Sequence, residues 1–154
     1  MKLYSFETSD VRLQTSDMEF CSSQLFDIMK LKTHNFKRLD VWRRARVLVK
    51  EVYRLTTDYP SSERFGLTSQ TRRCAVSIPS NIAEGCGRNS DRQMVHFCSI
   101  SRGSAFELET QILLGHDLEF LEENDSTILL GEISEIQRML DGLISTIENN
   151  SNSQ

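Results

Sequence analysis

The polar side chains with the most regular spacing lie between residues 70 and 84. They follow one another at three, four, four and three residues, so they share one helix face: Gln70, Arg73, Ser77, Asn81 and Glu84. A shorter set continues this spacing farther along the chain: Ser104, Glu107 and Gln111. We call these eight residues the polar stripe. Amide, hydroxyl and charged groups in this pattern predict a hydrogen-bonded network where two such faces meet. The alternatives are a solvated face, an interface with a partner or subunit, and an active site.

The residue types that most often perform catalysis or bind metals form no recognisable pattern. The cysteines lack the CxxC spacing of zinc modules, and the histidines are isolated along the chain: Cys21, Cys74, Cys86, Cys98, His34, His96 and His116. The sequence contains no glycine-rich phosphate loop and no Ser/His/Asp arrangement. We therefore expect no catalytic residue, no metal, no cofactor and no enzymatic activity.

Basic and acidic residues are segregated along the chain. Residues 30–104 contain 15 Lys and Arg against 6 Asp and Glu, whereas residues 105–154 contain 1 against 11, and the whole chain has a net charge of −4. The basic part predicts a phosphate-binding surface. Its candidate residues for binding nucleic acid are Lys37, Arg38, Arg43, Arg44, Arg46, Lys50, Arg72 and Arg73. The alternative is that the two parts attract each other within one bundle or across an oligomer.

Length and composition indicate one helical domain. The chain has 154 residues, of which 38% are hydrophobic and 26% charged, typical of a globular protein. With 7 Gly and 2 Pro it has too few turn formers for a many-stranded sheet protein. No apolar run approaches the roughly 20 residues of a membrane-spanning helix, and no signal-peptide core is evident. We expect reduced cysteines, a cytoplasmic location and no membrane partner.

Four segments have the hydrophobic period of packed helices. They cover residues 40–57, 67–84, 91–121 and 126–148. The expected capping residues are Asp40, Thr68 or Ser69, and Ser90, and Pro79 predicts a kinked or broken second helix. The fold class is therefore all-α, an antiparallel up-down four-helix bundle over residues 36–150. Residues 1–35 have no sustained period and predict a weakly structured N-terminal extension, within which Met29 is a candidate natural start.

Several ordered motifs carry a resemblance to a known family. They are Phe36-x-x-Leu39-x-Val41-Trp42, Leu67-Thr68-Ser69-Gln70-x-Arg72-Arg73, Ser77-Ile78-Pro79-Ser80-Asn81-Ile82-Ala83-Glu84-Gly85 and Gly103-Ser104-x-x-Glu107-Leu108-Glu109-Thr110-Gln111. Together they resemble the bacterial four helix bundle protein family, whose genes were first noticed inside intervening sequences of 23S ribosomal RNA. The resemblance implies an up-down bundle that assembles as a cyclic homopentamer. It also implies kinship with accessory proteins of diversity-generating retroelements, which bind nucleic acid and a reverse transcriptase. The N-terminal extension exceeds what the family usually carries.

Two functional hypotheses remain open. The first is a non-enzymatic oligomeric scaffold that binds RNA or DNA through its basic residues. The second is a protein–protein adaptor whose polar stripe and acidic helices dock a partner enzyme such as a reverse transcriptase. Because residues on the stripe belong to the family motifs, we expect them to form an interface or bind a ligand. Arg73 and Glu84 are too far apart to pair, so we expect partners on the next helix or on a neighbouring subunit.

Overall fold

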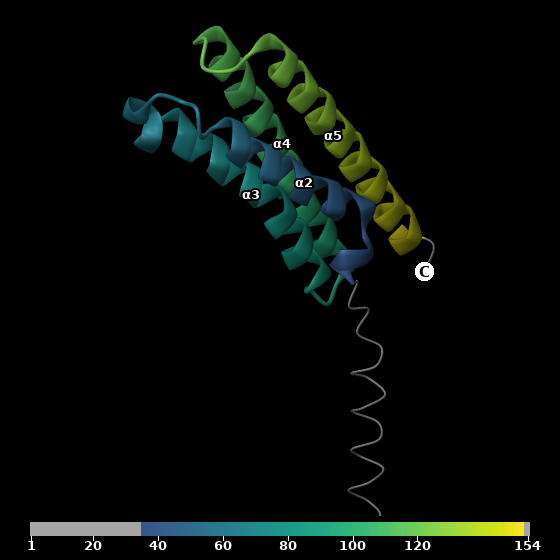
Figure 1. Ribbon diagram of the computed structural model, residues 1–154. Helices are drawn as coiled ribbons and strands as arrows, with labels where there is room; N and C mark the ends of the chain where they lie inside the picture. Colours follow the sequence, from purple (N-terminus) through teal and green to yellow (C-terminus); the bar gives the residue numbers. More distant parts are fainter. Residues whose placement is uncertain (1–34, 153–154) are drawn as a thin grey trace, which may run out of the picture. The chain divides into compact units, whose positions relative to one another are not determined.

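The computed structural model describes residues 35–152 of the 154-residue chain, and this part is built of helices alone (Figure 1). Its elements are η1 (Phe36–Arg38), α2 (Asp40–Leu55), η2 (Ser61–Phe65), α3 (Leu67–Cys86), α4 (Asp91–Asp117) and α5 (Glu123–Asn152). All but the last residue of the predicted N-terminal extension lies outside the described part. The all-α prediction is confirmed for the residues that are described.

The four long helices form an antiparallel up-down bundle, as predicted. Each helix packs against two others, in the pairs α2–α3, α3–α4, α4–α5 and α2–α5. Figure 1 shows α2 and α4 running one way and α3 and α5 the other. Within residues 35–152, neither diagonal pair makes a contact between its backbones. The bundle therefore keeps α2 and α4 on opposite corners.

The core follows the hydrophobic seams of the sequence. Every predicted seam residue of α2 is buried: Val41, Ala45, Leu48, Val52 and Leu55. The predicted seam of α5 is also buried except at Leu143, which packs against the core from its edge; its residues are Leu129, Ile133, Ile136, Leu140, Leu143 and Ile147. The fully buried side chains on the other helices are also mostly aliphatic, including Ile78, Ile82, Leu108 and Ile112. Burial of these groups supplies the main driving force for folding.

The helix ends differ from the predictions at two of three caps. Leu39, not Asp40, precedes the first turn of α2, and Gly66 precedes α3 in place of Thr68 or Ser69. The carboxylate of Glu63 instead accepts a hydrogen bond from the Leu67 N–H at 3.0 Å. The third cap is confirmed, because the Ser90 hydroxyl accepts from the Gln93 N–H at 3.2 Å.

Pro79 does not break α3, which continues from Leu67 to Cys86. A proline inside a helix removes one hydrogen bond, and packing must offset that loss. Pro79 is buried, and its neighbour Ile78 is fully enclosed in the core. The Ser101 hydroxyl of α4 also donates to the Ile78 carbonyl at 2.9 Å. Contacts with α4 therefore hold this part of α3 in place.

Helix α4 ends earlier than predicted because the chain turns back on itself at Glu119. This residue has φ 61°, in the left-handed region that a non-glycine residue rarely adopts. The N–H groups of Phe120 and Leu121 then donate to the Gly115 carbonyl at 2.9 and 3.1 Å. The turn lets α5 begin at Glu123, three residues before its predicted start.

Candidate functional site

The candidate nucleic-acid residues separate into cations that hold the fold together and cations that face solvent. Arg43 belongs to the first group. Its guanidinium pairs with Asp40 at 3.1 Å and donates to the carbonyls of Lys37 and Arg38 at 3.1 and 2.9 Å. These contacts close η1 onto the first turn of α2. Arg43 is therefore partly committed to local structure.

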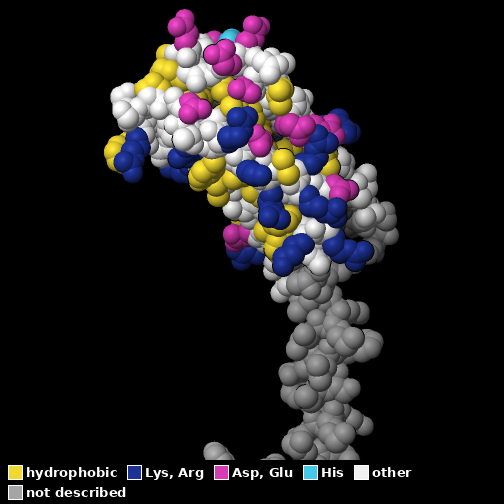
Figure 2. Space-filling view, in the orientation of Figure 1, with side chains coloured by type: hydrophobic (Ala, Val, Ile, Leu, Met, Phe, Trp, Pro, Cys, Tyr) yellow, Lys and Arg dark blue, Asp and Glu magenta, His cyan; other side chains and the backbone are white. Residues whose placement is uncertain are grey.

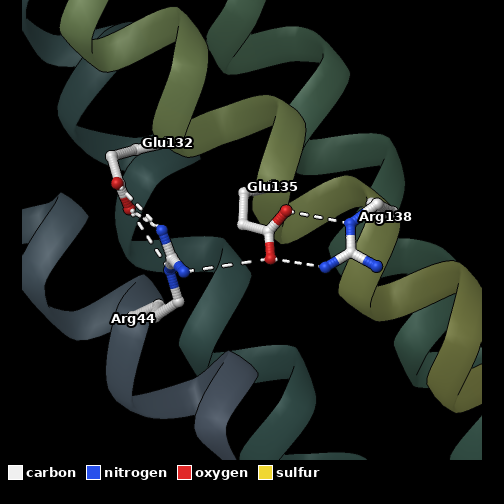
Figure 3. Close-up of polar contacts among 4 residues, drawn as sticks. All are labelled: Arg44, Glu132, Glu135 and Arg138. Carbon is white, nitrogen blue, oxygen red and sulfur yellow. Dashed lines mark hydrogen bonds and ion pairs between the residues drawn. The ribbon is translucent and has the colours of Figure 1, made fainter.

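Arg44 joins α2 to α5 (Figure 3). Its guanidinium donates to both carboxylate oxygens of Glu132, the shorter contacts being 2.9 Å, and lies 3.8 Å from Glu135. Arg138 reaches the same Glu135 carboxylate at 2.6 Å. That hydrogen bond is the main reason why the pKa of Glu135 is lowered. Here the basic and acidic parts of the chain attract each other within one bundle, so Arg44 is not free to contact a phosphate without losing these partners.

Four cations on η1 and α2 form what we call the basic edge: Lys37, Arg38, Arg46 and Lys50. All four side chains are exposed, and none pairs with a carboxylate of the described residues. Arg46 lies 5.0 Å from the Trp42 ring centroid and Lys37 5.9 Å from that of Phe36, which packs edge-on against Trp42. Figure 2 shows Lys and Arg side chains gathered over η1 and the first half of α2.

The two remaining candidates lie on α3, away from the basic edge. Arg72 donates to the Thr56 hydroxyl at 2.8 Å, and its guanidinium lies 4.9 Å from the Tyr53 ring centroid. Arg73 is exposed on the next position of α3 and pairs with no carboxylate within residues 35–151. The structure therefore does not unite all eight candidates in one surface.

The middle of the polar stripe forms the predicted link between two helices. The hydroxyls of Ser77 on α3 and Ser104 on α4 are 2.9 Å apart. The Asn81 amide donates to the Ser77 hydroxyl at 2.9 Å and to its carbonyl at 2.8 Å. Ser104 is only 8% exposed, so this network lies at the seam where α3 meets α4.

A second part of the seam contains an unsatisfied amide. The Gln111 side chain donates to Cys74 Sγ at 3.4 Å, while its own Oε1 is buried without a hydrogen-bond partner. Burial, together with the nearby Glu107 carboxylate, raises the pKa of the Cys74 thiol to about 11. A buried amide oxygen without a partner costs about 1–3 kcal/mol. The α3–α4 seam is therefore incompletely satisfied within one chain.

The ends of the polar stripe do not join this network. Gln70, Arg73 and Glu84 are exposed, and Glu84 pairs with Arg88 one turn along its own helix. Of the two expected sources of a partner for Glu84, α4 supplies none within residues 35–151, and a neighbouring subunit stays a prediction. A carboxylate and an arginine four residues apart on an exposed helix surface satisfy each other locally.

An apolar outer face on α4 was not predicted. Five large side chains on the solvent side of this helix are 40–54% exposed: Ile100, Phe106, Leu113, Leu114 and Leu118. The small residues Ser101, Ser104 and Ala105 are buried inside the bundle, and only Gly103 of that group is exposed. Because these side chains are small, they allow α3 to pack closely against α4 within one chain. The sequence did contain a sign of this outer face, because the segment that forms α4 has apolar residues on both sides of the helix, as buried helices do.

The described residues offer little for catalysis or metal binding. Cys74, Cys86 and Cys98 are free and buried, and burial raises the pKa of Cys98 to about 12, so its reactive thiolate is disfavoured. Within residues 35–152, no three His, Cys, Asp or Glu side chains are placed to hold a metal ion. Across the same stretch, no helix has the length and hydropathy needed to span a membrane.

Comparisons with known proteins give a family and a fold. A family model described as 23S rRNA-intervening sequence protein matches residues 37–142. A solved structure from Bacteroides thetaiotaomicron, described as a protein of unknown function from the S23 ribosomal protein family, is similar with a TM-score of 0.64. It is 20% identical, over 68% of this chain and 95% of that one, so it supports the fold alone. Comparison with curated proteins gives no match.

Proposed function

The chain belongs to the 23S rRNA-intervening sequence protein family, and from that premise we propose a non-enzymatic oligomeric scaffold that binds RNA or DNA. The observation that carries the proposal is the basic edge, where four exposed cations have no carboxylate partner among residues 35–151. Unpaired Lys and Arg side chains retain their full charge for phosphate groups and release counterions when they bind. Arg43 and Arg44 support this edge through their contacts within the bundle.

The apolar outer face of α4 supports assembly of several copies. Several large apolar side chains exposed along one side of a helix commonly mark an interaction site. The incompletely satisfied α3–α4 seam lies beside it, at Gln111. Family resemblance favours a cyclic pentamer, in which each subunit would add one basic edge. Several weak contacts on one ring then bind a single nucleic acid more tightly than one subunit does. The buried free cysteines fit action in the reducing cytoplasm.

Salt dependence tests the nucleic-acid proposal. We expect the affinity for a single-stranded RNA to fall steeply with salt, with a slope of about −0.7 for each phosphate neutralised. Replacing the four basic-edge cations by Gln should flatten that slope by about 3. Arg138→Gln is the matched control, because it removes one charge from α5 outside the basic edge. A wild-type chain that binds no RNA or DNA at low salt would refute the proposal.

Light scattering tests assembly independently. We expect wild-type protein to have several times the mass of one 17.7 kDa chain. Leu114→Glu, which places a charge on the outer face of α4, should lower that mass without unfolding the bundle. Ile128→Glu is the control, because Ile128 is an exposed apolar residue on α5. A wild-type mass near that of one chain at micromolar concentration would contradict the assembly.

The adaptor hypothesis is favoured by a different surface. Five carboxylates cluster around the turn from α4 to α5, and Figure 2 shows acidic side chains gathered at that end: Asp117, Glu119, Glu122, Glu123 and Asp125. A cluster of this sign suits a basic partner protein. Such an adaptor would purify without nucleic acid, and its partner binding would survive the basic-edge substitutions.

A further inference from the structure

A cavity lies at the corner where α2, η2 and the start of α3 meet. Its volume is about 350 Å³, within the range of pockets that hold small ligands. The lining residues that the argument uses are Thr57, Ser61, Arg64, Thr68 and Arg72. The cavity lies at the C-terminal end of α2, whereas the basic edge begins at its N-terminal end.

The charge around this cavity is positive. Arg64 and Arg72 line it, and no Asp or Glu does. Among the described residues, Arg72 has only neutral partners, the Thr56 hydroxyl and the Tyr53 carbonyl and ring. Two carboxylates are adjacent in sequence to lining residues without lining the cavity themselves: Glu63 accepts the Leu67 N–H at the start of α3, and Asp58 is exposed. Two arginines with fixed planar donor groups are well suited to bind the oxygens of a phosphate.

Thr68 lies in the wall of the cavity, at the start of α3. This lining residue is only 7% exposed, and its hydroxyl has no hydrogen-bond partner among the described residues. Threonine hydroxyls in the first turn of a helix normally find a partner, since a buried hydroxyl without one is unfavourable. The N-terminal end of the 20-residue α3, where Thr68 lies, also attracts negative charge.

Two exposed aromatic rings flank the arginines. Phe65 is 87% exposed, the highest value among the large hydrophobic residues described, and Tyr53 is 43% exposed. The Arg64 guanidinium lies 5.8 Å from the Phe65 ring centroid. Nothing in the bundle core requires a phenylalanine at a position so accessible to water. Exposed aromatic rings beside cations are the platforms on which unpaired bases stack.

We propose that this corner is a nucleotide-binding subsite. Arg64 and Arg72 hold one phosphate group beside the N-terminal end of α3, and Phe65 stacks on the attached base. The inference rests on the proposed function in one respect: the nucleotide is taken to be a unit of single-stranded nucleic acid. A free nucleotide offers the same phosphate and base, so the experiment must distinguish the two sources.

The test compares three probes on the full chain: a fluorescent octauridylate, adenosine 5′-monophosphate and inorganic phosphate. We expect Arg64→Gln and Phe65→Ala each to weaken binding of the octamer about tenfold or more. Thr68→Val should leave octamer affinity unchanged and keep or raise the midpoint in urea, because the hydroxyl that it removes is enclosed and has no partner among the described residues. Arg138→Gln, with the same charge change on α5, is the control.

The remaining outcomes separate this inference from the proposed function. Unchanged octamer affinity in the Arg64 and Phe65 variants, with a loss in the basic-edge variants, would overturn the subsite and leave the proposed function intact. If the wild type binds the monophosphate but no octamer, and the same variants lose that binding, the subsite stands for a free nucleotide and the proposed function fails. If the wild type binds neither nucleotide probe, the subsite is refuted, even where inorganic phosphate binds, and the low-salt binding of longer RNA and DNA decides the proposed function separately.

Discussion

Gly115→Ala tests whether the contact between the end of α4 and Tyr59, in the segment that joins α2 to η2, is packed as tightly as the structure indicates. An added methyl carbon would lie 3.2 Å from Cζ of Tyr59 and under 3.0 Å from its hydroxyl oxygen, so an atom must shift. Tyr59 has little room to move, because it is only 7% exposed and its ring lies 5.6 Å from that of Phe120. The substitution therefore forces either the tyrosine or the end of α4 away from its position.

The expected size of the effect follows from two opposing contributions. Inserting a methyl group into a packed site costs about 1–3 kcal/mol. Alanine in place of glycine inside a helix raises the free energy of unfolding by up to about 1 kcal/mol. Gly131→Ala on α5 isolates the second contribution, because no atom lies within 4 Å of its added methyl group. We expect Gly115→Ala to lower the free energy of unfolding by about 1–2 kcal/mol and Gly131→Ala to raise it by about 0.5–1 kcal/mol.

The assay is urea unfolding followed by circular dichroism at one fixed protein concentration, because assembly makes stability depend on concentration. Tyr59→Phe in the wild-type and Gly115→Ala backgrounds completes a double-mutant cycle. Removing the hydroxyl should recover much of the lost stability, since that oxygen is the nearest atom to the added methyl. A Gly115→Ala protein as stable as Gly131→Ala, or one that Tyr59→Phe does not rescue, would refute the reasoning.

Further predictions concern the thiols, the link between α2 and α5, and the polar stripe. Burial raises the pKa of the Cys98 thiol from 9.0 to about 12, so as pH rises the unfolded chain loses the thiol proton before the folded chain does. The urea midpoint should therefore fall as pH rises above about 9, and Cys98→Ala should reduce that fall. A double-mutant cycle on Arg44 and Glu132 should give a coupling below about 1 kcal/mol, since both side chains are more than a third exposed; a larger coupling would show that the pair is effectively desolvated. Arg73→Ala and Glu84→Ala should each change the unfolding free energy by less than about 0.5 kcal/mol, because both side chains are exposed. A lowered mass of these variants in light scattering would place the two residues at the subunit interface. Unchanged mass and unchanged RNA retention would show that they are solvated residues.

The sequence was sufficient to predict the bundle because helix periodicity is a local property. Val41, Ala45, Leu48, Val52 and Leu55 recur every three or four residues and are all buried. The same reasoning placed Ser77 and Ser104 on faces that meet at a distance of 2.9 Å. Spacing within each helix therefore predicted both the core and the middle of the polar stripe.

Features that depend on distant residues could not be predicted in this way. Arg44 is a candidate phosphate ligand by sequence, yet its carboxylate partner Glu132 lies 88 residues away. The Glu63 cap of α3 depends on the short η2 helix, which has no hydrophobic period. At Glu119, the left-handed turn lacks the glycine that usually signals one. Each miss arises where a side chain or backbone conformation is decided by its surroundings.

The arrangement of the bundle makes assembly and nucleic-acid binding compatible. The apolar outer face belongs to α4 and the basic edge to α2, and these helices occupy opposite corners with α3 and α5 between them. Copies that associate through α4 therefore leave α2 of every subunit accessible. The acidic residues of α5 bind Arg44 on the side of α2 away from α3, whereas Arg72 and the proposed subsite lie on the α3 side. Attraction within the bundle thus neutralises one side of α2 and leaves its other side available for a phosphate backbone.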